Sequence, residues 1–162
     1  MTADALVAPN SRKCLGNVGS FVNQYRANAQ TLANSLGNRV TAAEVLAVAG
    51  NESTYGTSSF AAFGNFFGLH GNGRAGTYYT TQNHTAVTMF PPIQGGFMAS
   101  GQVFVSRVRS LYDAGTRSKS LAFFPVLNQH GYATGNSAYP KTMTSTNPRG
   151  SYTLVSACMA GH

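Results

Sequence analysis

Acidic residues are scarce in this chain of 162 residues. Four Asp and Glu stand against eleven Lys and Arg, which gives a formal net charge of +7. Such an excess favours an anionic partner, for example a cell wall, a nucleic acid or a membrane surface. The basic residues form no run along the chain, and their dispersal favours general attraction to an anionic matrix over a defined nucleic-acid site. We therefore expect no nucleic-acid partner.

Charged residues of both signs are also few. They make up 9% of the chain, while hydrophobic residues make up 43%, and this balance excludes a disordered tail. We find no internal repeat and no linker, and the length suits one domain that can bury its own core. We expect a single domain over residues 1–162 that acts as a monomer.

Long apolar runs are missing as well. No stretch approaches the apolar length of a membrane-spanning helix, so we expect no membrane insertion. The first sixteen residues lack the apolar core of a secretory signal, because the polar segment Asn10–Lys13 interrupts it. We expect either that a leader was removed or that the protein leaves its cell by a route that needs no leader.

Cysteine is limited to Cys14 and Cys158, near opposite ends of the chain. The termini of a domain often lie close together, so a disulfide between these residues is a reasonable prediction. It would stabilise the fold by roughly 3–5 kcal/mol in the chain-entropy model and would indicate an oxidising compartment. The alternative is a pair of unrelated buried thiols.

Metal-binding and cofactor-binding motifs are absent from the sequence. The four histidines have no metal-ligand spacing, and the two cysteines are far apart in the sequence. There is no phosphate-binding motif and no nucleophile elbow. We therefore predict neither a metal nor a cofactor.

What the sequence does contain is helical periodicity. Apolar residues recur at helical spacing from Phe21 to Leu36, and a capping box over Thr41–Glu44 predicts a second helix that ends before Gly56. Further helical stretches are predicted through 97–111, 121–127, 139–143 and 148–159, although Pro125 should limit the second of these.

Between the early and late helices the pattern changes. Glycines and alternating Thr, Tyr and Val residues over 77–81 and 85–89 predict a small irregular hairpin. The order predicts an α+β, helix-dominated fold in which a small β lobe flanks a cleft.

The scarcity of carboxylates lets each one be considered in turn. Asp4 lies in a segment without a pattern, Glu44 is explained by the capping box, and Asp113 is at a turn position after a helix. Glu52 instead projects from the apolar face of its helix, close to the C-terminus. Burial and the negative end of the helix dipole both raise a carboxyl pKa, as a general acid near neutral pH requires. The alternative is a buried structural glutamate.

Four segments together resemble glycoside hydrolase family 73, the bacterial peptidoglycan N-acetylglucosaminidases. Residues 43–58 resemble the helix that carries that family's Glu-Ser-x-aromatic-Gly-x-Ser motif, and residues 65–70 resemble its Asn-Leu-Phe-Gly-Ile-Lys segment. Phe90 followed by residues 94–97 resembles its entry into the next helix. Residues 131–134 with Tyr139 are similar to its Tyr-Ala-Thr-Asp-Pro-x-Tyr motif.

The resemblance implies a lysozyme-like fold and assigns roles to individual residues. Glu52 would be the catalytic acid, and Tyr132 would position the acetamido group or stabilise positive charge. Phe67, His70 and Tyr139 would contact the sugar chain. For Phe67 the alternative is a place in the core, and for Tyr139 it is packing in the cleft wall.

The chain also departs from the family pattern. Gly135 stands where the family has Asp, and one extra residue separates Tyr132 from Tyr139. No Asp or Glu occurs from Ser53 to Tyr112, so the β lobe cannot supply a second carboxylate. This leaves attack by the substrate's own N-acetyl group, water held by polar side chains, or transglycosylation.

The expected function is cleavage of peptidoglycan glycan strands, at the N-acetylglucosaminyl–N-acetylmuramic acid bond. A lytic transglycosylase or muramidase and a catalytically silent wall-binding module are the alternatives. A protein of this kind would act in the periplasm or on the cell wall, either as a phage lysin or as a toxin injected into rival bacteria by type VI secretion. An injected toxin would have a cognate inhibitory (immunity) protein that occludes its cleft.

Overall fold

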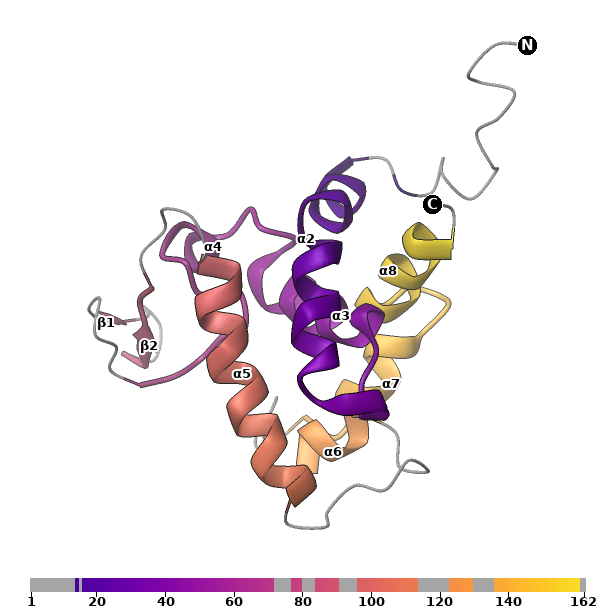
Figure 1. The fold of residues 1–162 in the computed structure, drawn as a ribbon. Coiled ribbons are helices and arrows are strands. Elements are labelled where there is room, and N and C mark those ends of the chain that lie inside the picture. Colours follow the sequence, from indigo (N-terminus) through magenta and orange to yellow (C-terminus); the bar gives the residue numbers. More distant parts are fainter. Residues whose placement is uncertain are drawn as a thin grey trace.

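The computed structural model describes Cys14 and residues 16–71, 77–79, 84–90, 96–113, 123–129 and 136–160. Within these ranges the chain forms seven α-helices and one two-stranded hairpin, so the helix-dominated fold is confirmed. Helices α2, α3, α7 and α8 lie on one side of the molecule, α5 runs along the other, and the hairpin lies beyond α5 (Figure 1).

The first two long helices follow the predicted pattern. Helix α2 spans Gly16–Asn34 and is followed by a short 3₁₀ helix, Gly37–Arg39. Helix α3 spans Ala42–Ser53 and begins with the predicted capping box: the Glu44 backbone N–H donates to Thr41 Oγ1, and the Thr41 N–H donates to Glu44 Oε1. Glu44 therefore has the structural role that the sequence predicted.

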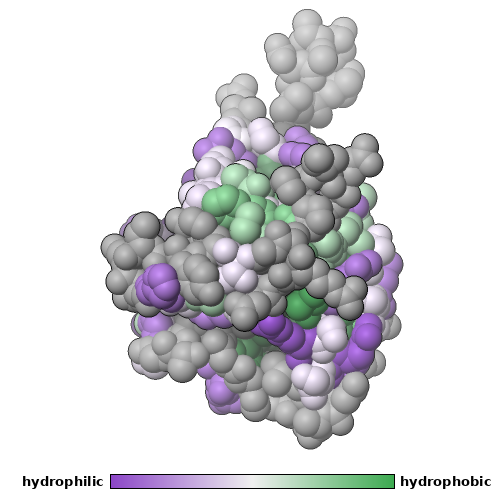
Figure 2. Space-filling model, turned by 90° about the vertical axis from the view of Figure 1, so that its left-hand side faces the viewer, coloured by the Kyte–Doolittle hydropathy of each residue, from purple (hydrophilic) through white to green (hydrophobic). Residues whose placement is uncertain are grey.

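The β lobe is small. After the four-residue helix α4, Ser59–Ala62, strands β1 (Thr77–Tyr79) and β2 (Ala86–Thr88) pair antiparallel, so the predicted hairpin is confirmed. Val87 points inward and is buried, and a further bridge joins it to His70. On this side of the molecule apolar side chains reach the surface next to polar ones (Figure 2).

The later helices are also close to their predicted positions. They are α5, Gly96–Asp113; α6, Phe123–Gln129; α7, Tyr139–Thr144; and α8, Ser151–Ala160. Pro125 lies in the first turn of α6, where a backbone N–H has no intrahelical acceptor, so proline does not limit that helix.

Helix α3 is the centre of the core. It packs against α2 and α8, and α2 also packs against α5 and α8. Every residue from Val45 to Gly50 is buried, and Ser151 at the start of α8 donates a hydrogen bond to the Ala47 carbonyl at 2.7 Å. The middle of α3 is therefore held by the surrounding core and by α8, which fixes the position of the last turn that follows. None of the described helices is long and apolar enough to cross a membrane.

The two cysteines are neighbours, but no disulfide joins them. Cys14 is 6% exposed, Cys158 is fully buried, and their thiols are hydrogen-bonded to each other. The predicted proximity of Cys14 and Cys158 is confirmed, whereas the predicted disulfide is not formed in this structure. Packing of the start of α2 against α8 brings the sulfurs together, but bond formation also requires an oxidant.

Candidate active site

Glu52 lies in the last turn of α3 and is half-buried. Burial removes water from its carboxyl group and raises its pKa from 4.5 to about 7. An acid with a pKa near 7 keeps its proton for a large fraction of the time at neutral pH and can still release it. The raised pKa that the sequence predicted for Glu52 is therefore present, with burial as its cause, and the role of general acid stays a prediction.

Gly68 lies directly against the Glu52 carboxyl group. Its φ is +63°, and a Cβ added there would lie 2.5 Å from Glu52 Oε2 and 3.0 Å from Cδ. Any larger residue would displace the carboxyl group, and a non-glycine residue would also strain the backbone. The close approach of the loop shields one side of Glu52 from water.

Asn65 fixes the loop that carries Gly68. Its side chain is fully buried, its Nδ2 donates to the carbonyls of Leu69 and Thr88 at 2.9 Å each, and its Oδ1 accepts from the Leu69 N–H at 3.0 Å. These bonds tie the loop to itself and to β2. Asn65 was not among the predicted site residues, although it lies in one of the segments that resemble glycoside hydrolase family 73.

The turn after Glu52 has an unusual backbone. Thr54 and Tyr55 have positive φ values of 50° and 52°, and Gly56 follows at 80°. Ser53 holds this turn: its hydroxyl donates to the Ala49 carbonyl at 2.6 Å and accepts from the Gly56 N–H at 3.0 Å. Two consecutive non-glycine residues in this conformation cost free energy, and such strain clusters at functional sites.

Gly50 allows the same turn to fold back on its helix. A Cβ at Gly50 would lie 2.7 Å from the Tyr55 ring. The ring also lies edge-on against Phe21, with 6.0 Å between centroids. The contact between Gly50 and Tyr55 therefore holds the turn against the end of α3, on either side of Glu52 in the chain. The sequence alone did not predict this contact.

Tyr139 lies close enough to Glu52 to interact with its charge. Its side chain is 4% exposed, and its hydroxyl is buried without a hydrogen-bond partner in the described part of the chain. Burial raises the pKa of Tyr139, and the Glu52 carboxylate raises it further. The structure thus brings together two residues that the sequence assigned to one site, and the buried ring packs in the wall as the alternative predicted.

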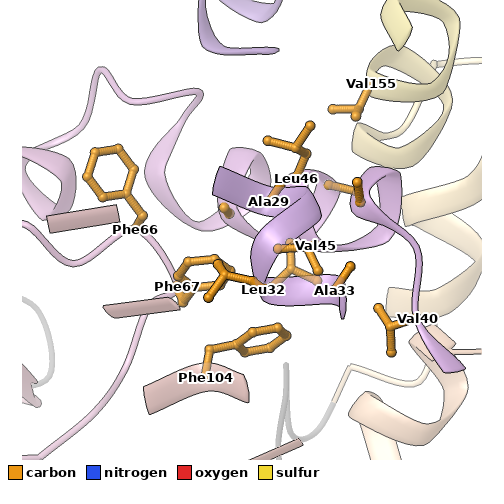
Figure 3. Close-up of a cluster of buried hydrophobic side chains, with 14 of the residues drawn as sticks. Ala29, Leu32, Ala33, Val40, Val45, Leu46, Phe66, Phe67, Phe104 and Val155 are labelled. Carbon is orange, nitrogen blue, oxygen red and sulfur yellow. The ribbon is translucent and has the colours of Figure 1, made fainter. Parts of the chain in front are cut away.

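The assignment of Phe67 as a sugar platform is wrong. Phe67 is fully buried and stacks on Phe104, with centroids 4.7 Å apart and planes at 17°. In Figure 3 it lies near Leu32 and Phe104, and the ring of Phe66 points away from them. Its burial stabilises the fold by about 2 kcal/mol and leaves no ring face for a ligand.

The structure describes His70 but not Tyr132, the other two residues that were predicted to contact or position the substrate. His70 is exposed at the edge of the β lobe, where its carbonyl accepts a long hydrogen bond of 3.4 Å from Arg107. It therefore has an accessible side chain, and its contact with substrate stays a prediction. Tyr132 lies outside the described residues.

Of the two carboxylates whose side chains the structure describes, Glu52 is the candidate acid because Glu44 is already engaged. Glu44 is held by Thr41 at the opposite end of α3. Asp113 ends α5, but its side chain is outside the described part, as is Asp4. Among the residues that the structure describes, no three His, Cys, Asp or Glu side chains are grouped so as to hold a metal ion.

The fold is shared with two solved proteins. One is a chain in the structure of a type VI secretion system effector–immunity complex from Pseudomonas protegens, with a TM-score of 0.68 and 24% identity over 92% of this chain and 96% of that chain. The other is the catalytic domain of the autolysin Auto from Listeria monocytogenes, with a TM-score of 0.61 and 18% identity over 96% and 93%.

Because the sequence identities are low, these comparisons establish the fold alone. No family model matches the sequence, and no curated protein is similar to it at a significant level. Membership of glycoside hydrolase family 73 therefore stays a prediction. The organisation as a single domain likewise stays a prediction.

Proposed function

We propose that this protein cleaves the glycan strands of peptidoglycan, at the β-1,4 bond between N-acetylglucosamine and N-acetylmuramic acid, with Glu52 as the general acid. The observation that carries the proposal is the state of Glu52: a half-buried carboxyl group with a pKa of about 7, at the end of the central helix and against Gly68. The shared fold with an autolysin catalytic domain supports the same activity.

Glu52 would donate its proton to the glycosidic oxygen as the bond from that oxygen to the anomeric carbon breaks. The leaving sugar then departs as a neutral alcohol, and positive charge develops on the ring that stays behind. The carboxylate left on Glu52 is next to this charge and stabilises it. In the second step Glu52 would take a proton from the attacking water and return to its starting state.

The second catalytic group would come from the substrate. Since no Asp or Glu occurs from Ser53 to Tyr112, the β lobe offers no carboxylate opposite Glu52. The carbonyl oxygen of the substrate's own N-acetyl group can attack the anomeric carbon instead, which is a known exception to the use of two carboxylates. In this mechanism Tyr132 would position the acetamido group.

The biological setting that we propose is attack on a rival bacterium. The similar chain from Pseudomonas protegens belongs to an effector–immunity complex of a type VI secretion system. A cognate inhibitory protein that covers the cleft around Glu52 would then protect the producing cell. The net charge of +7 would favour retention of the enzyme on the anionic wall.

Digestion of purified sacculi followed by mass spectrometry of the fragments tests the activity. We expect fragments with N-acetylglucosamine at the reducing end. Reducing-end N-acetylmuramic acid would identify a muramidase, and a 1,6-anhydro ring would identify a lytic transglycosylase. If no fragment is released although the protein binds sacculi, the chain is a wall-binding module and the proposal is wrong.

A further inference from the structure

The structure also contains a cavity that Glu52 does not line. It has a volume of about 540 Å³ and is formed by α2, the segment from Gly56 to α4, and the start of α5. Neither Glu52, Gly68 nor Tyr139 lines it. The mechanism proposed above makes no use of this cavity.

Two side-chain amides on α2 face the cavity without partners. Gln24 and Asn28 are one helical turn apart, both line the cavity, and neither side chain has a hydrogen-bond partner in the described part of the chain. The same helix offers a contrast, since the Gln30 amide donates to Asn34 Oδ1 at 2.8 Å. The amides at the cavity are therefore available to a ligand as both donors and acceptors.

The opposite wall adds hydroxyl groups. Ser58 is the N-cap residue of α4, but its Oγ is buried and has no partner among the described residues, so it is not accessible to a ligand. Thr57 lies beside it and is exposed, and its hydroxyl donates to the Thr54 carbonyl at 2.7 Å. The Thr57 oxygen can still accept a hydrogen bond, so both walls of the cavity offer polar groups.

An aromatic ring lies between these polar walls. Tyr25 stacks on Phe97, with centroids 4.5 Å apart and planes at 8°, and its edge contacts Phe66 at 5.1 Å. This packing fixes the Tyr25 ring and provides the apolar part of the cavity. Among the described residues, no acidic or basic side chain lines the cavity. Its chemistry therefore suits a neutral ligand that has an apolar face and carries hydroxyl and amide groups.

We propose that this cavity is a second glycan-binding site, which holds an N-acetylhexosamine unit away from the reacting bond. The sugar's apolar face would lie against Tyr25, and its amide and hydroxyl groups would bond Gln24, Asn28 and Thr57. That the glycan is the cell-wall polymer rests on the proposed function, but sugar binding does not. Binding of the same polymer at a second site raises the effective concentration, at Glu52, of the bond to be cut.

NMR titration of the ¹⁵N-labelled protein with tetra-N-acetylchitotetraose tests the site. We expect the amide signals of residues 24–28 and 56–58 to shift. In the double variant Gln24→Ala/Asn28→Ala the dissociation constant for these shifts should rise about tenfold or more, from the loss of two hydrogen bonds. Gln30→Ala, an exposed amide on the same helix, is the matched control and should leave the dissociation constant unchanged. Shifts confined to the surroundings of Glu52, or equal effects of both variants, would overturn the site.

Digestion of sacculi separates this inference from the proposed function. The double variant should raise KM several-fold and leave kcat unchanged, because Gln24 and Asn28 take no part in the proposed proton transfer from Glu52. A chain that binds the sugar in this cavity but does not digest sacculi would refute the proposed function alone. A chain that digests sacculi without any response of the cavity would refute the second site alone.

Discussion

The Tyr139 hydroxyl is buried within electrostatic reach of the Glu52 carboxyl group, and it has no hydrogen-bond partner among the described residues. A buried hydroxyl without a partner destabilises a fold by about 1–3 kcal/mol. We propose that a substrate atom becomes the partner of this hydroxyl during the reaction at Glu52.

Tyr139→Phe tests this explanation. Loss of the unpaired hydroxyl should raise the free energy of unfolding by about 1 kcal/mol, while turnover of sacculi should fall several-fold. Thermal melting and digestion rates measure the two effects. A more stable variant with unchanged turnover would show that Tyr139 only packs the wall of the site.

Gly68→Ala tests the contact that confines Glu52. The added methyl group would lie 2.5 Å from Oε2, so the carboxyl group must move, and turnover should fall by about tenfold or more. Gly37→Ala is a matched control, since Gly37 has a similar φ of +66° but nothing within 4 Å of an added Cβ. Both variants should lose about 1 kcal/mol of stability from backbone strain. Equal turnover in the two variants would contradict a role for the Gly68 contact.

The raised pKa of Glu52 also predicts how stability depends on pH. Because the folded-state pKa, about 7, exceeds the ordinary value of 4.5, the folded protein holds this proton more tightly than the unfolded chain does. The resulting stabilisation is fully present below about pH 4.5 and is lost as the pH rises through about 7. Glu52→Gln lacks this dependence.

The comparison is made by chemical unfolding at pH 4.5 and pH 8. Between these values the wild type should lose up to about 3 kcal/mol relative to Glu52→Gln. Because the two proteins share all other titratable groups, the contributions of those groups cancel in the difference between the two free energies of unfolding. A constant difference across the range would show that Glu52 is not held in an environment that disfavours its charge.

The adjacent thiols predict a response to oxidants. Treatment with oxidised glutathione should join Cys14 to Cys158, since packing already places them in contact. Burial and the neighbouring Cys14 thiol both raise the pKa of Cys158, which lowers its reactive thiolate fraction. We therefore expect the reaction to be slow. Closure of so long a loop should stabilise the fold by roughly 3–5 kcal/mol.

Thiol titration and melting before and after oxidation check this, with Cys14→Ser as the control that cannot form the bond. Two free thiols after prolonged oxidation of the wild type would exclude the disulfide and would remove its support for an oxidising compartment.

Much of the fold could be predicted because its signals are local. The capping box at Thr41–Glu44 and the apolar spacing in α2 depend on residues within one or two turns, and the structure has both where they were predicted. The burial of Glu52 could also be predicted, because its place on an apolar helix face already implies it. Its assignment as the catalytic acid rests on this chemistry and on the resemblance, and it stays a prediction.

The errors and omissions arise where distant parts of the chain meet. Phe66 and Phe67 both contact aromatic rings of α5, and the sequence of their segment does not reveal that Phe67 is fully buried against Phe104. The contact of Gly68 with Glu52 and the hydrogen bond from Asn65 to Thr88 join residues that only the folded chain brings together. A thiol pair can be placed by the proximity of the chain ends, but its oxidation state depends on the surroundings.

The most direct test of the account is the rate at which Glu52→Gln digests purified sacculi, compared with the wild type at pH 6. The amide has the size of the acid but cannot donate its proton, so the rate should fall by a factor of about 10³ or more while the melting temperature is kept or raised. A folded Glu52→Gln variant that releases fragments at close to the wild-type rate would contradict the assignment of Glu52 as the catalytic acid.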